Sequence, residues 1–141
     1  MAEAEIDLRT LNIGDRLPTV IHGPLQRGDF ALFAGGSHDH MLLHIDSDYA
    51  KAAGMDDVFA QGMFSMAFLA QMFTNVLPQN RLKTWSARFL AITPLYATVT
   101  CTGEVIDVFE EAGENYARLK ISAEIDNGIQ TIAGDAVICI S

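Results

Sequence analysis

The segment AQGMFSMAFLAQMFTNVLP, residues 60–78, is apolar on nearly every side when it is arranged as a helix. Its apolar side chains are Met63, Phe64, Met66, Ala67, Phe68, Leu69, Met72 and Phe73. A helix that is apolar all round is a buried helix, and Pro78 marks the region where it must end. In a chain of 141 residues, the rest of the sequence must therefore wrap around this helix.

The last part of the chain supplies candidate strands for this wrapping. Four stretches have strand character: RLKTWSARFLAI, ATVTCTGEVIDVFE, NYARLKISAEID and IQTIAGDAVICIS. From Ala117 to Asp126 apolar and polar residues alternate, as in a strand with one face exposed to water. The turn sequences EEAGEN and DNG predict hairpins, and hence an antiparallel meander. A helix followed by strands predicts an α+β fold, with the buried helix on one face of a curved sheet.

Shorter elements are predicted before the main helix. RLPTVIHGPL contains one extended piece, and Leu25 to Ala34 give a rough helical face that Gly35 and Gly36 are predicted to end. DSDYAKAAG reads as a short helix with Asp46 or Ser47 as N-cap and Gly54 at its end. The chain shows no repeat or linker, so we expect residues 1–141 to form a single domain.

Composition excludes several classes of protein. A net charge of -9 is the opposite of what a nucleic-acid binder shows. No apolar stretch is long enough to cross a membrane, and the first residues lack the apolar core of a signal peptide. Cys101 and Cys139 both fall in predicted strands, so we expect reduced thiols and a cytoplasmic location.

The stretch SHDHMLLHID, residues 37–46, holds three of the four histidines in the chain. His38 and His40 lie two positions apart and His44 could add a third imidazole, which is a known zinc arrangement. No further ligand with metal-like spacing appears elsewhere, because His22 is isolated. We therefore expect no metal and no other cofactor. His38 and His40 are interpreted as solvated loop residues.

Asp39 and His44 form a different candidate pair in the same stretch. A bent loop can bring a carboxylate and an imidazole onto one water molecule or one small ligand. Such a pair can act as acid and base near neutral pH. The spacing alone is a weak signal, and its weight comes from the residues around it.

This region resembles the MaoC-like (R)-specific enoyl-thioester hydratases and dehydratases, a family with the hot-dog fold. The family's motif runs S-G-D-x-N-P-x-H, then a short helix, then H-G-M at the start of the buried helix. Here Ser37-His38-Asp39 stands at S-G-D, HMLLH ends on His44, and Gln61-Gly62-Met63 stands at H-G-M. Downstream, ARFLAITPLYATVTCTGEV resembles the family's RF-x-x-P-V-x-x-G-D strand.

The chain departs from the family pattern at several positions. His38 replaces the glycine of S-G-D, Met41 and Leu42 replace Asn-Pro, and Gln61 replaces the histidine of H-G-M. Ala70 stands where some members carry a serine in the buried helix. These substitutions bear on the substrate and on efficiency, and they leave the reaction type open to this chain.

The resemblance implies three catalytic residues. Asp39 and His44 would bind a water and exchange its proton, with Asp39 as the proton carrier and His44 orienting the water. Gly62 lies at the start of the predicted helix, where free backbone N–H groups could stabilise negative charge on a thioester oxygen. Tight packing of the helix start against the sheet is the alternative interpretation of Gly62.

Further residues are candidates for substrate binding. Gln61 could donate a hydrogen bond to the catalytic loop. The side chains nearest the catalytic end of the helix could line an acyl tunnel; these are Met63, Phe64 and Met66. A basic cluster of Arg81, Lys83 and Arg88 could meet coenzyme A phosphates or an acidic carrier protein, with Arg88 the best placed, although a solvated face is the plainer interpretation.

The expected function is therefore that of a hydro-lyase in fatty acid metabolism. It would hydrate trans-2-enoyl thioesters of CoA or an acyl carrier to (3R)-3-hydroxyacyl thioesters. The resemblance also implies a homodimer with a continuous sheet, because a lone hot-dog domain leaves a sheet edge open. The alternatives are a complementary or non-catalytic subunit of a hetero-oligomeric dehydratase, or a thioesterase.

Overall fold

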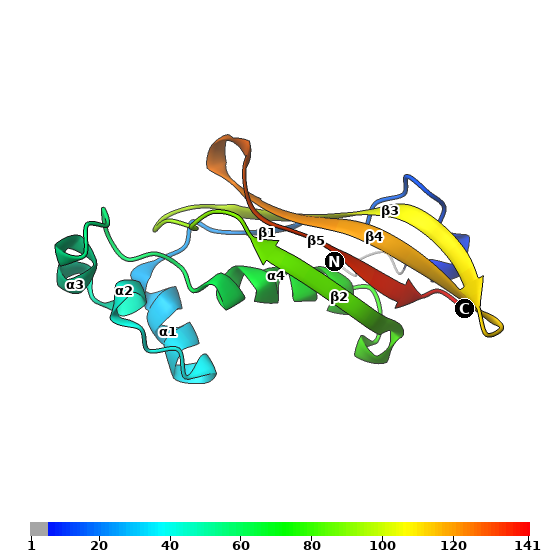
Figure 1. Cartoon of the computed structure of the whole chain (residues 1–141), viewed down its shortest axis with the longest axis horizontal. Helices are drawn as coiled ribbons and strands as arrows, with labels where there is room; N and C mark the ends of the chain where they lie inside the picture. The colour runs from blue at the N-terminus through cyan, green and yellow to red at the C-terminus, as the bar shows by residue number, and fades with distance from the viewer. Residues whose placement is uncertain (1–5) are drawn as a thin grey trace.

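The computed structural model describes residues 6–141, which form one curved antiparallel sheet of five strands with a helix against it (Figure 1). This arrangement confirms the predicted α+β class. The elements in chain order are η1 (Leu8–Thr10), β1 (Val20–His22), α1 (Arg27–Ser37), α2 (Leu42–Ile45), α3 (Ser47–Ala52), α4 (Gly62–Thr74), η2 (Gln79–Arg81), β2 (Leu82–Phe89), β3 (Val99–Glu111), β4 (Glu114–Ile125), η3 (Asp126–Gly128) and β5 (Ile129–Cys139).

The sheet has the strand order β1-β3-β4-β5-β2. The meander is confirmed for β3, β4 and β5, and it is wrong for β2, which pairs with β5 in the register Trp85 to Ala136. The reason is that β3 already has β4 on one edge and β1 on the other, with Val20 opposite Cys101. The free edge of β5 is therefore the place where β2 can find backbone partners.

The core lies between α4 and the concave face of the sheet. The alternation predicted for β4 is confirmed, since Ala117, Leu119, Ile121 and Ala123 are all fully buried. They face the buried side chains of α4, which are Ser65, Phe68, Leu69, Met72 and Phe73. Burying a side chain the size of leucine or phenylalanine contributes about 1.5–3 kcal/mol, so this contact holds the helix in place.

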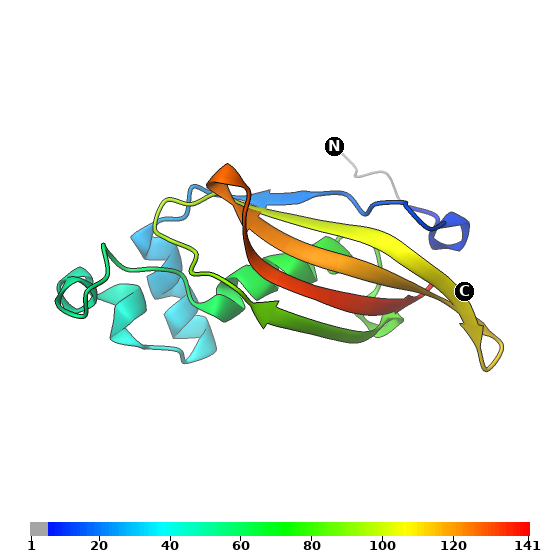
Figure 2. The same ribbon diagram turned by 45° about the horizontal axis from the view of Figure 1, so that its top comes forward.

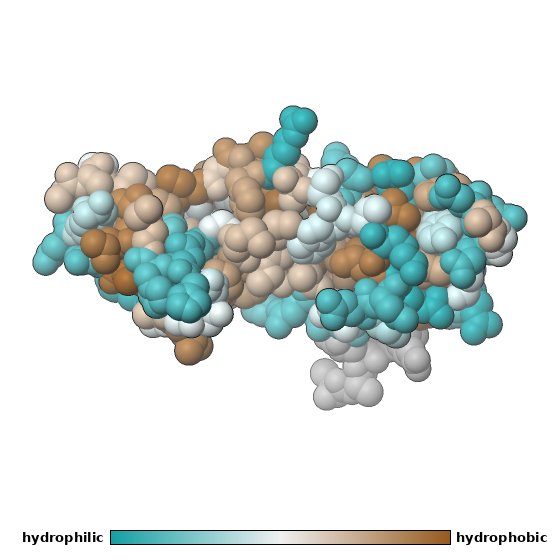
Figure 3. Space-filling view, turned by 60° about the horizontal axis from the view of Figure 1, so that its bottom comes forward, coloured by the Kyte–Doolittle hydropathy of each residue, from teal (hydrophilic) through white to brown (hydrophobic). Residues whose placement is uncertain are grey.

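The helix α4 is not buried on every side, which corrects the prediction from its composition. Met63 is 56% exposed, because the sheet covers one face of the helix and leaves the opposite face open. At the neighbouring end of β2, Phe89 and Leu90 are each 53% exposed. Figure 3 shows apolar side chains along the middle of the face that carries α4 and β2.

The helices α1, α2 and α3 gather at one end of the molecule, beyond the first turn of α4 (Figure 2). The predicted end of α1 is wrong, since the helix continues through Gly35 and Gly36 to Ser37. The Ser37 hydroxyl donates to the Phe33 carbonyl at 2.7 Å and closes this last turn. His38 then ends the helix in the left-handed conformation, with φ of 65°.

The histidine stretch is also more ordered than the loop that was predicted. Leu42 to Ile45 form the short helix α2, which carries His44. The next helix, α3, is confirmed with its caps: the Asp46 side chain accepts from the Tyr49 amide at 3.1 Å, and Gly54 follows with φ of 90°. Two short helices therefore lie between α1 and α4.

Two further sequence expectations concern the thiols and the membrane. Cys101 lies in β3 and Cys139 in β5, and both are buried free thiols. Burial raises the pKa of the Cys101 thiol to about 12. Among residues 6–141, no helix combines the length and the hydropathy needed to cross a bilayer.

We expect Gly134→Ala to destabilise the fold by about 1–3 kcal/mol, the usual cost of overpacking. A Cβ at Gly134 would overlap the carbonyl oxygen of Ser86 on β2, and this backbone cannot move without disturbing the pairing of β2 with β5. In the matched control, Gly103→Ala, the new Cβ would lie 2.9 Å from the flexible end of Met72. The control should lose less stability, and equal losses in urea unfolding would contradict this account.

Candidate active site

Asp39 and His44 come together at the end of the molecule where α1, α2 and α4 meet. Asp39 Oδ2 lies 3.9 Å from His44 Nε2. This separation is longer than a direct hydrogen bond, and it is short enough for both atoms to hydrogen-bond one water molecule placed to the side of the line that joins them. The imidazole side chain is 12% exposed and the carboxylate 45%, so the carboxylate is the more accessible of the two. The pair predicted from the sequence is therefore in place geometrically.

The orientation of His44 is set by a main-chain carbonyl. Its Nδ1 lies 2.7 Å from the carbonyl oxygen of Phe59, in the segment that leads into α4. Because a carbonyl only accepts, Nδ1 must carry the hydrogen in this contact. In the neutral ring, Nε2 then has a free lone pair, and this lone pair faces Asp39. Sequence reasoning missed Phe59, since a main-chain acceptor leaves no mark on the side-chain pattern.

The carboxylate of Asp39 is held by the turn that follows α1. The Asp39 amide donates to the Ser37 hydroxyl at 3.2 Å, and the Met41 amide lies 3.4 Å from Asp39 Oδ1. One carboxylate oxygen thus faces its own backbone, and the other, Oδ2, faces His44. Local hydrogen bonds of this kind are typical of aspartate in turns, and here they fix the direction of the second oxygen.

The other two histidines of the stretch do not join this pair. His38 and His40 are exposed, and their rings meet edge to face at 5.8 Å. Within residues 6–141, no cluster of three or more histidine, cysteine or acidic side chains has the geometry of a metal site. The zinc arrangement considered from the spacing of His38, His40 and His44 therefore finds no support in these side chains.

Gly62 is the first residue of α4, where backbone N–H groups have no partner within the helix. Phe59, which binds His44, lies three positions before it, so the two Cα atoms are at most about 11 Å apart. A Cβ on Gly62 would also lie 3.1 Å from the ring of Phe89 on β2. Tight packing against Phe89 thus favours glycine at the start of α4.

Gln61 is fully buried, and it binds α1 rather than the loop of Asp39 and His44. Its Nε2 donates to the Phe30 carbonyl at 2.9 Å, and its Oε1 is buried with no hydrogen-bond partner among the described residues. The predicted hydrogen bond to the loop is therefore wrong. Gln61 connects the start of α4 to α1, so a substitution of Gln61 would affect a bound substrate by disturbing this contact.

The three apolar candidates on α4 have different environments. Phe64 lines a cavity of about 500 Å³ beside α1, together with Leu32, Phe33 and Ser37. Its ring stacks on Phe33 with centroids 5.0 Å apart. Met63 is exposed, and Met66 packs against the core. Phe64 is therefore the α4 side chain that borders a hollow close to the loop of Asp39.

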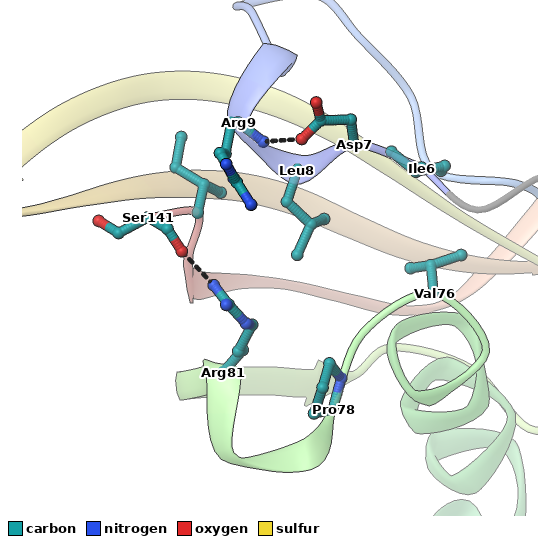
Figure 4. A pocket seen from close by; sticks show the side chains of 9 residues that line it. Ile6, Asp7, Leu8, Arg9, Val76, Pro78, Arg81 and Ser141 are labelled. Atoms are coloured by element: carbon teal, nitrogen blue, oxygen red, sulfur yellow. Dashed lines mark hydrogen bonds between the residues drawn. The ribbon is translucent and has the colours of Figure 1, made fainter.

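The predicted basic cluster is not a cluster in space. Arg81 precedes β2 and Arg88 lies near its end, so roughly 20 Å of strand separates them. Arg81 donates to the Ser141 carbonyl at 2.6 Å and lines a cavity of about 520 Å³ at the far end of α4 (Figure 4). Arg88 is exposed and directly precedes Phe89, which touches the start of α4. Because successive side chains of a strand point to opposite faces, Arg88 points away from the face on which Phe89 meets α4.

Comparison with known protein families identifies the family to which the chain belongs. The family model described as the MaoC like domain, a dehydratase family, matches residues 10–124. This range contains the loop of Asp39 and His44, the start of α4 and the strands β1 to β3 with most of β4. A search of curated proteins returned no match.

Solved structures show the same fold at low sequence identity. R-hydratase PhaJ1 from Pseudomonas aeruginosa is 24% identical with a TM-score of 0.83, covering 95% of this chain and 84% of that one. The (R)-hydratase from A. caviae, described as involved in PHA biosynthesis, is 22% identical with a TM-score of 0.78 and coverage of 94% and 98%. A chain of the ChsH1–ChsH2 complex from Mycobacterium tuberculosis is 20% identical with a TM-score of 0.78, and the match covers 92% of this chain and 98% of that one.

These similarities agree with the architecture described above. The sheet of five antiparallel strands curves over α4, as in the hot-dog fold of the hydratases. The family model covers the greater part of the sequence, including the segment that holds Asp39 and His44. The chain belongs to the MaoC-like dehydratase family and has the hot-dog fold.

Proposed function

We propose that this chain is a hydro-lyase that adds water reversibly to trans-2-enoyl thioesters, giving (3R)-3-hydroxyacyl thioesters. The observation that carries the proposal is the facing pair of Asp39 Oδ2 and His44 Nε2, 3.9 Å apart, with the ring orientation fixed by Phe59. The family assignment and the similarity to R-hydratases support it. A thioesterase would not need this pair in the loop before α4.

In the proposed reaction, one water lies beside the two groups, within hydrogen-bond distance of both, and donates one hydrogen to the free lone pair of His44 Nε2 and the other to Asp39. As the water oxygen bonds to C3, its proton passes to the Asp39 carboxylate and the C2=C3 electrons move toward the thioester. Asp39 then returns the proton to C2, so one molecule of water has been added in total. Because one centre supplies both the hydroxyl at C3 and the proton at C2, the two groups add to the same face of the double bond.

The negative charge that builds up on the thioester oxygen needs a donor. The free N–H groups at the start of α4 point out of the helix, and the helix dipole favours an anion there. Gly62 would let the oxygen approach these donors closely. The loss of one donor of this kind in other enzymes costs about 100- to 1,000-fold in rate.

The substrate would extend from this centre in two directions. The apolar cavity bordered by Phe64, Phe33 and Leu32 is the proposed place for the acyl group. Met63 and Met66 flank Phe64 in the sequence of α4, and we propose that they shape the entrance. Arg88 is the proposed contact for a phosphate of CoA or for an acidic carrier, since it is an exposed cation near the end of β2, although its side chain is on the face of the strand opposite to Phe89.

We further propose that the chain acts as a homodimer of single domains in the cytoplasm. Strand β2 is the longer of the two sheet edges, and a long free edge favours pairing with another strand. Apolar side chains lie exposed beside it, including Phe89 and Leu90. The free thiols Cys101 and Cys139 suit a reducing compartment. The alternative is a subunit of a hetero-oligomer, as the two-component ChsH1–ChsH2 complex suggests.

We expect Asp39→Asn to lower kcat on the best substrate by about 100-fold or more, because the amide has the shape of the carboxylate but cannot accept the proton. The measurement is a hydration assay over crotonyl-, octenoyl- and ring-bearing enoyl-CoA substrates. His40→Ala, in the same turn, is the control and should keep its activity. Turnover of Asp39→Asn above a tenth of wild type would exclude Asp39 as the proton carrier.

Removal of metal ions should leave both activity and stability unchanged. The proposed chemistry uses a carboxylate, an imidazole and backbone donors, and none of these steps requires a Lewis acid. The purified chain is treated with a strong chelator, and its turnover and Tm are compared with those of untreated protein. Stoichiometric zinc, with activity lost when it is stripped, would instead support a site at His38, His40 and His44.

The purified chain should hydrate at least one enoyl-CoA without a partner. Asp39, His44 and the start of α4 all belong to one chain, so no catalytic group has to come from a different subunit. The assay is run first on the chain alone and then after mixing with another hot-dog subunit from the same source. Activity that appears only on mixing would favour the complementary-subunit alternative.

A further inference from the structure

The segment that binds His44 is itself held by a partly buried carboxylate. Asp57 lies two positions before Phe59, whose carbonyl accepts the hydrogen of His44 Nδ1. Its side chain is 20% exposed, in the connection between α3 and α4. The position of Asp57 has no part in the motif that identified the Asp39–His44 pair.

Three donors converge on the Asp57 carboxylate. Oδ1 accepts from the Ser47 hydroxyl at 2.6 Å and from the Val58 amide at 2.7 Å. Oδ2 accepts from Nη2 of Arg27 at 2.6 Å. These contacts hold the pKa of Asp57 well below its ordinary value, with the Ser47 hydrogen bond as the largest cause, then Arg27, then the Val58 amide. The carboxylate therefore stays ionised at any pH at which the reaction would be assayed.

The same cluster connects four segments of the chain. Arg27 opens α1, Ser47 opens α3, and the guanidinium also donates from Nη1 to the Tyr96 hydroxyl at 2.9 Å, in the loop before β3. Figure 2 shows α1 and α3 at the same end of the molecule. Arg27 is half exposed, so its ion pair alone contributes little to stability. The significance of the cluster lies in the geometry that three directed hydrogen bonds impose on Asp57.

This geometry reaches Phe59 through a single intervening residue. The Val58 amide is bound by Asp57, and Val58 is buried. On its other side Phe59 pairs with Pro94, and its amide lies 3.4 Å from the Leu43 carbonyl, next to His44. Fixing Asp57 therefore fixes the backbone on the N-terminal side of the carbonyl that selects the tautomer of His44.

We propose that Asp57, clamped by Ser47 and Arg27, is a positioning residue that keeps His44 in the tautomer with its lone pair toward Asp39. This inference rests on the proposed hydratase function, but its effect on the imidazole can be observed without any substrate. Without the clamp, the Phe59 carbonyl shifts and the ring hydrogen is shared between Nδ1 and Nε2. A hydrogen on Nε2 removes the acceptor that the bound water needs.

The chain contains a matched control cluster. Asp135 on β5 accepts from the Ser86 hydroxyl at 3.0 Å and from Arg118 at 2.9 Å, so it has one serine and one arginine as side-chain partners, as Asp57 does. It lies in the paired strands of the sheet, away from the loops around His44. Asp135→Ala therefore measures the general cost of losing such a cluster, without disturbing the segment that binds the imidazole.

The test uses the full chain labelled with ¹⁵N in histidine, with the His44 signals assigned by their loss in His44→Ala. In wild type above the titration of the imidazole, we expect a single tautomer with hydrogen on Nδ1. Asp57→Ala should show a mixture of tautomers, while Asp135→Ala should keep the wild-type pattern. Should Asp57→Ala fail to fold, Asp57→Asn and Ser47→Ala perturb the same clamp more mildly and replace it.

The kinetic arm compares kcat and KM on the most active substrate of the enoyl-CoA panel. Asp57→Ala should lose about 10- to 100-fold in kcat with KM within about threefold, the size of effect that slight misplacement of a catalytic group produces. An unchanged His44 tautomer in a folded Asp57 variant would overturn the positioning role, whatever the rate. Inactivity of wild type on every substrate would refute the hydratase proposal, and the tautomer result would still stand by itself.

Discussion

The burial of one face of α4 against the concave sheet is the constraint on which the rest of the structure depends. Phe68, Leu69, Met72 and Phe73 reach the sheet, so the helix has one fixed rotation about its axis. That rotation leaves Met63 in solvent and brings Gly62 against Phe89. The same packing also fixes the direction of the helix axis, and the start of α4, with its free N–H groups, lies toward the end of the molecule where α1, α2 and α3 gather. The site and the apolar exposed face both follow from this packing.

The parts of the fold that could be predicted are those with local causes. The alternation along β4 records which face of one strand is buried, and the caps of α3 are set by Asp46 and Gly54 alone. The position of β2 beside β5 and the exposure of one side of α4 depend on contacts between distant segments. No periodicity in a single segment contains that information. The end of α1 could not be predicted from local sequence either, because Gly35 and Gly36 permit a helix to end without requiring it.

The candidate site also has parts that the sequence could predict and parts that it could not. Asp39 and His44 could be predicted because a family resemblance marked them, and their meeting in space agrees with it. Phe59 acts through its main chain, so its side chain gives no sign of its contact with His44. Asp57 and Arg27 are separated by 30 positions and meet only because α1 and the segment before α4 fold together. Sequence spacing is informative within one element, and both of these contacts cross between elements.

Within residues 37–44, the departures from the family motif fall on the backbone around Asp39 and His44 rather than on these two residues. His38 adopts φ of 65°, a conformation natural to the glycine of the motif, at a cost of order 1 kcal/mol. Met41 is the N-cap of α2 and makes no side-chain cap bond, where the motif's asparagine would be a favoured cap. Leu42 occupies the first helical position, where proline is preorganised. A four-residue helix with neither aid cannot be stable by itself. In this chain the hydrogen bond from His44 to the Phe59 carbonyl therefore has two effects. It orients the imidazole, and it anchors α2, the helix that carries His44.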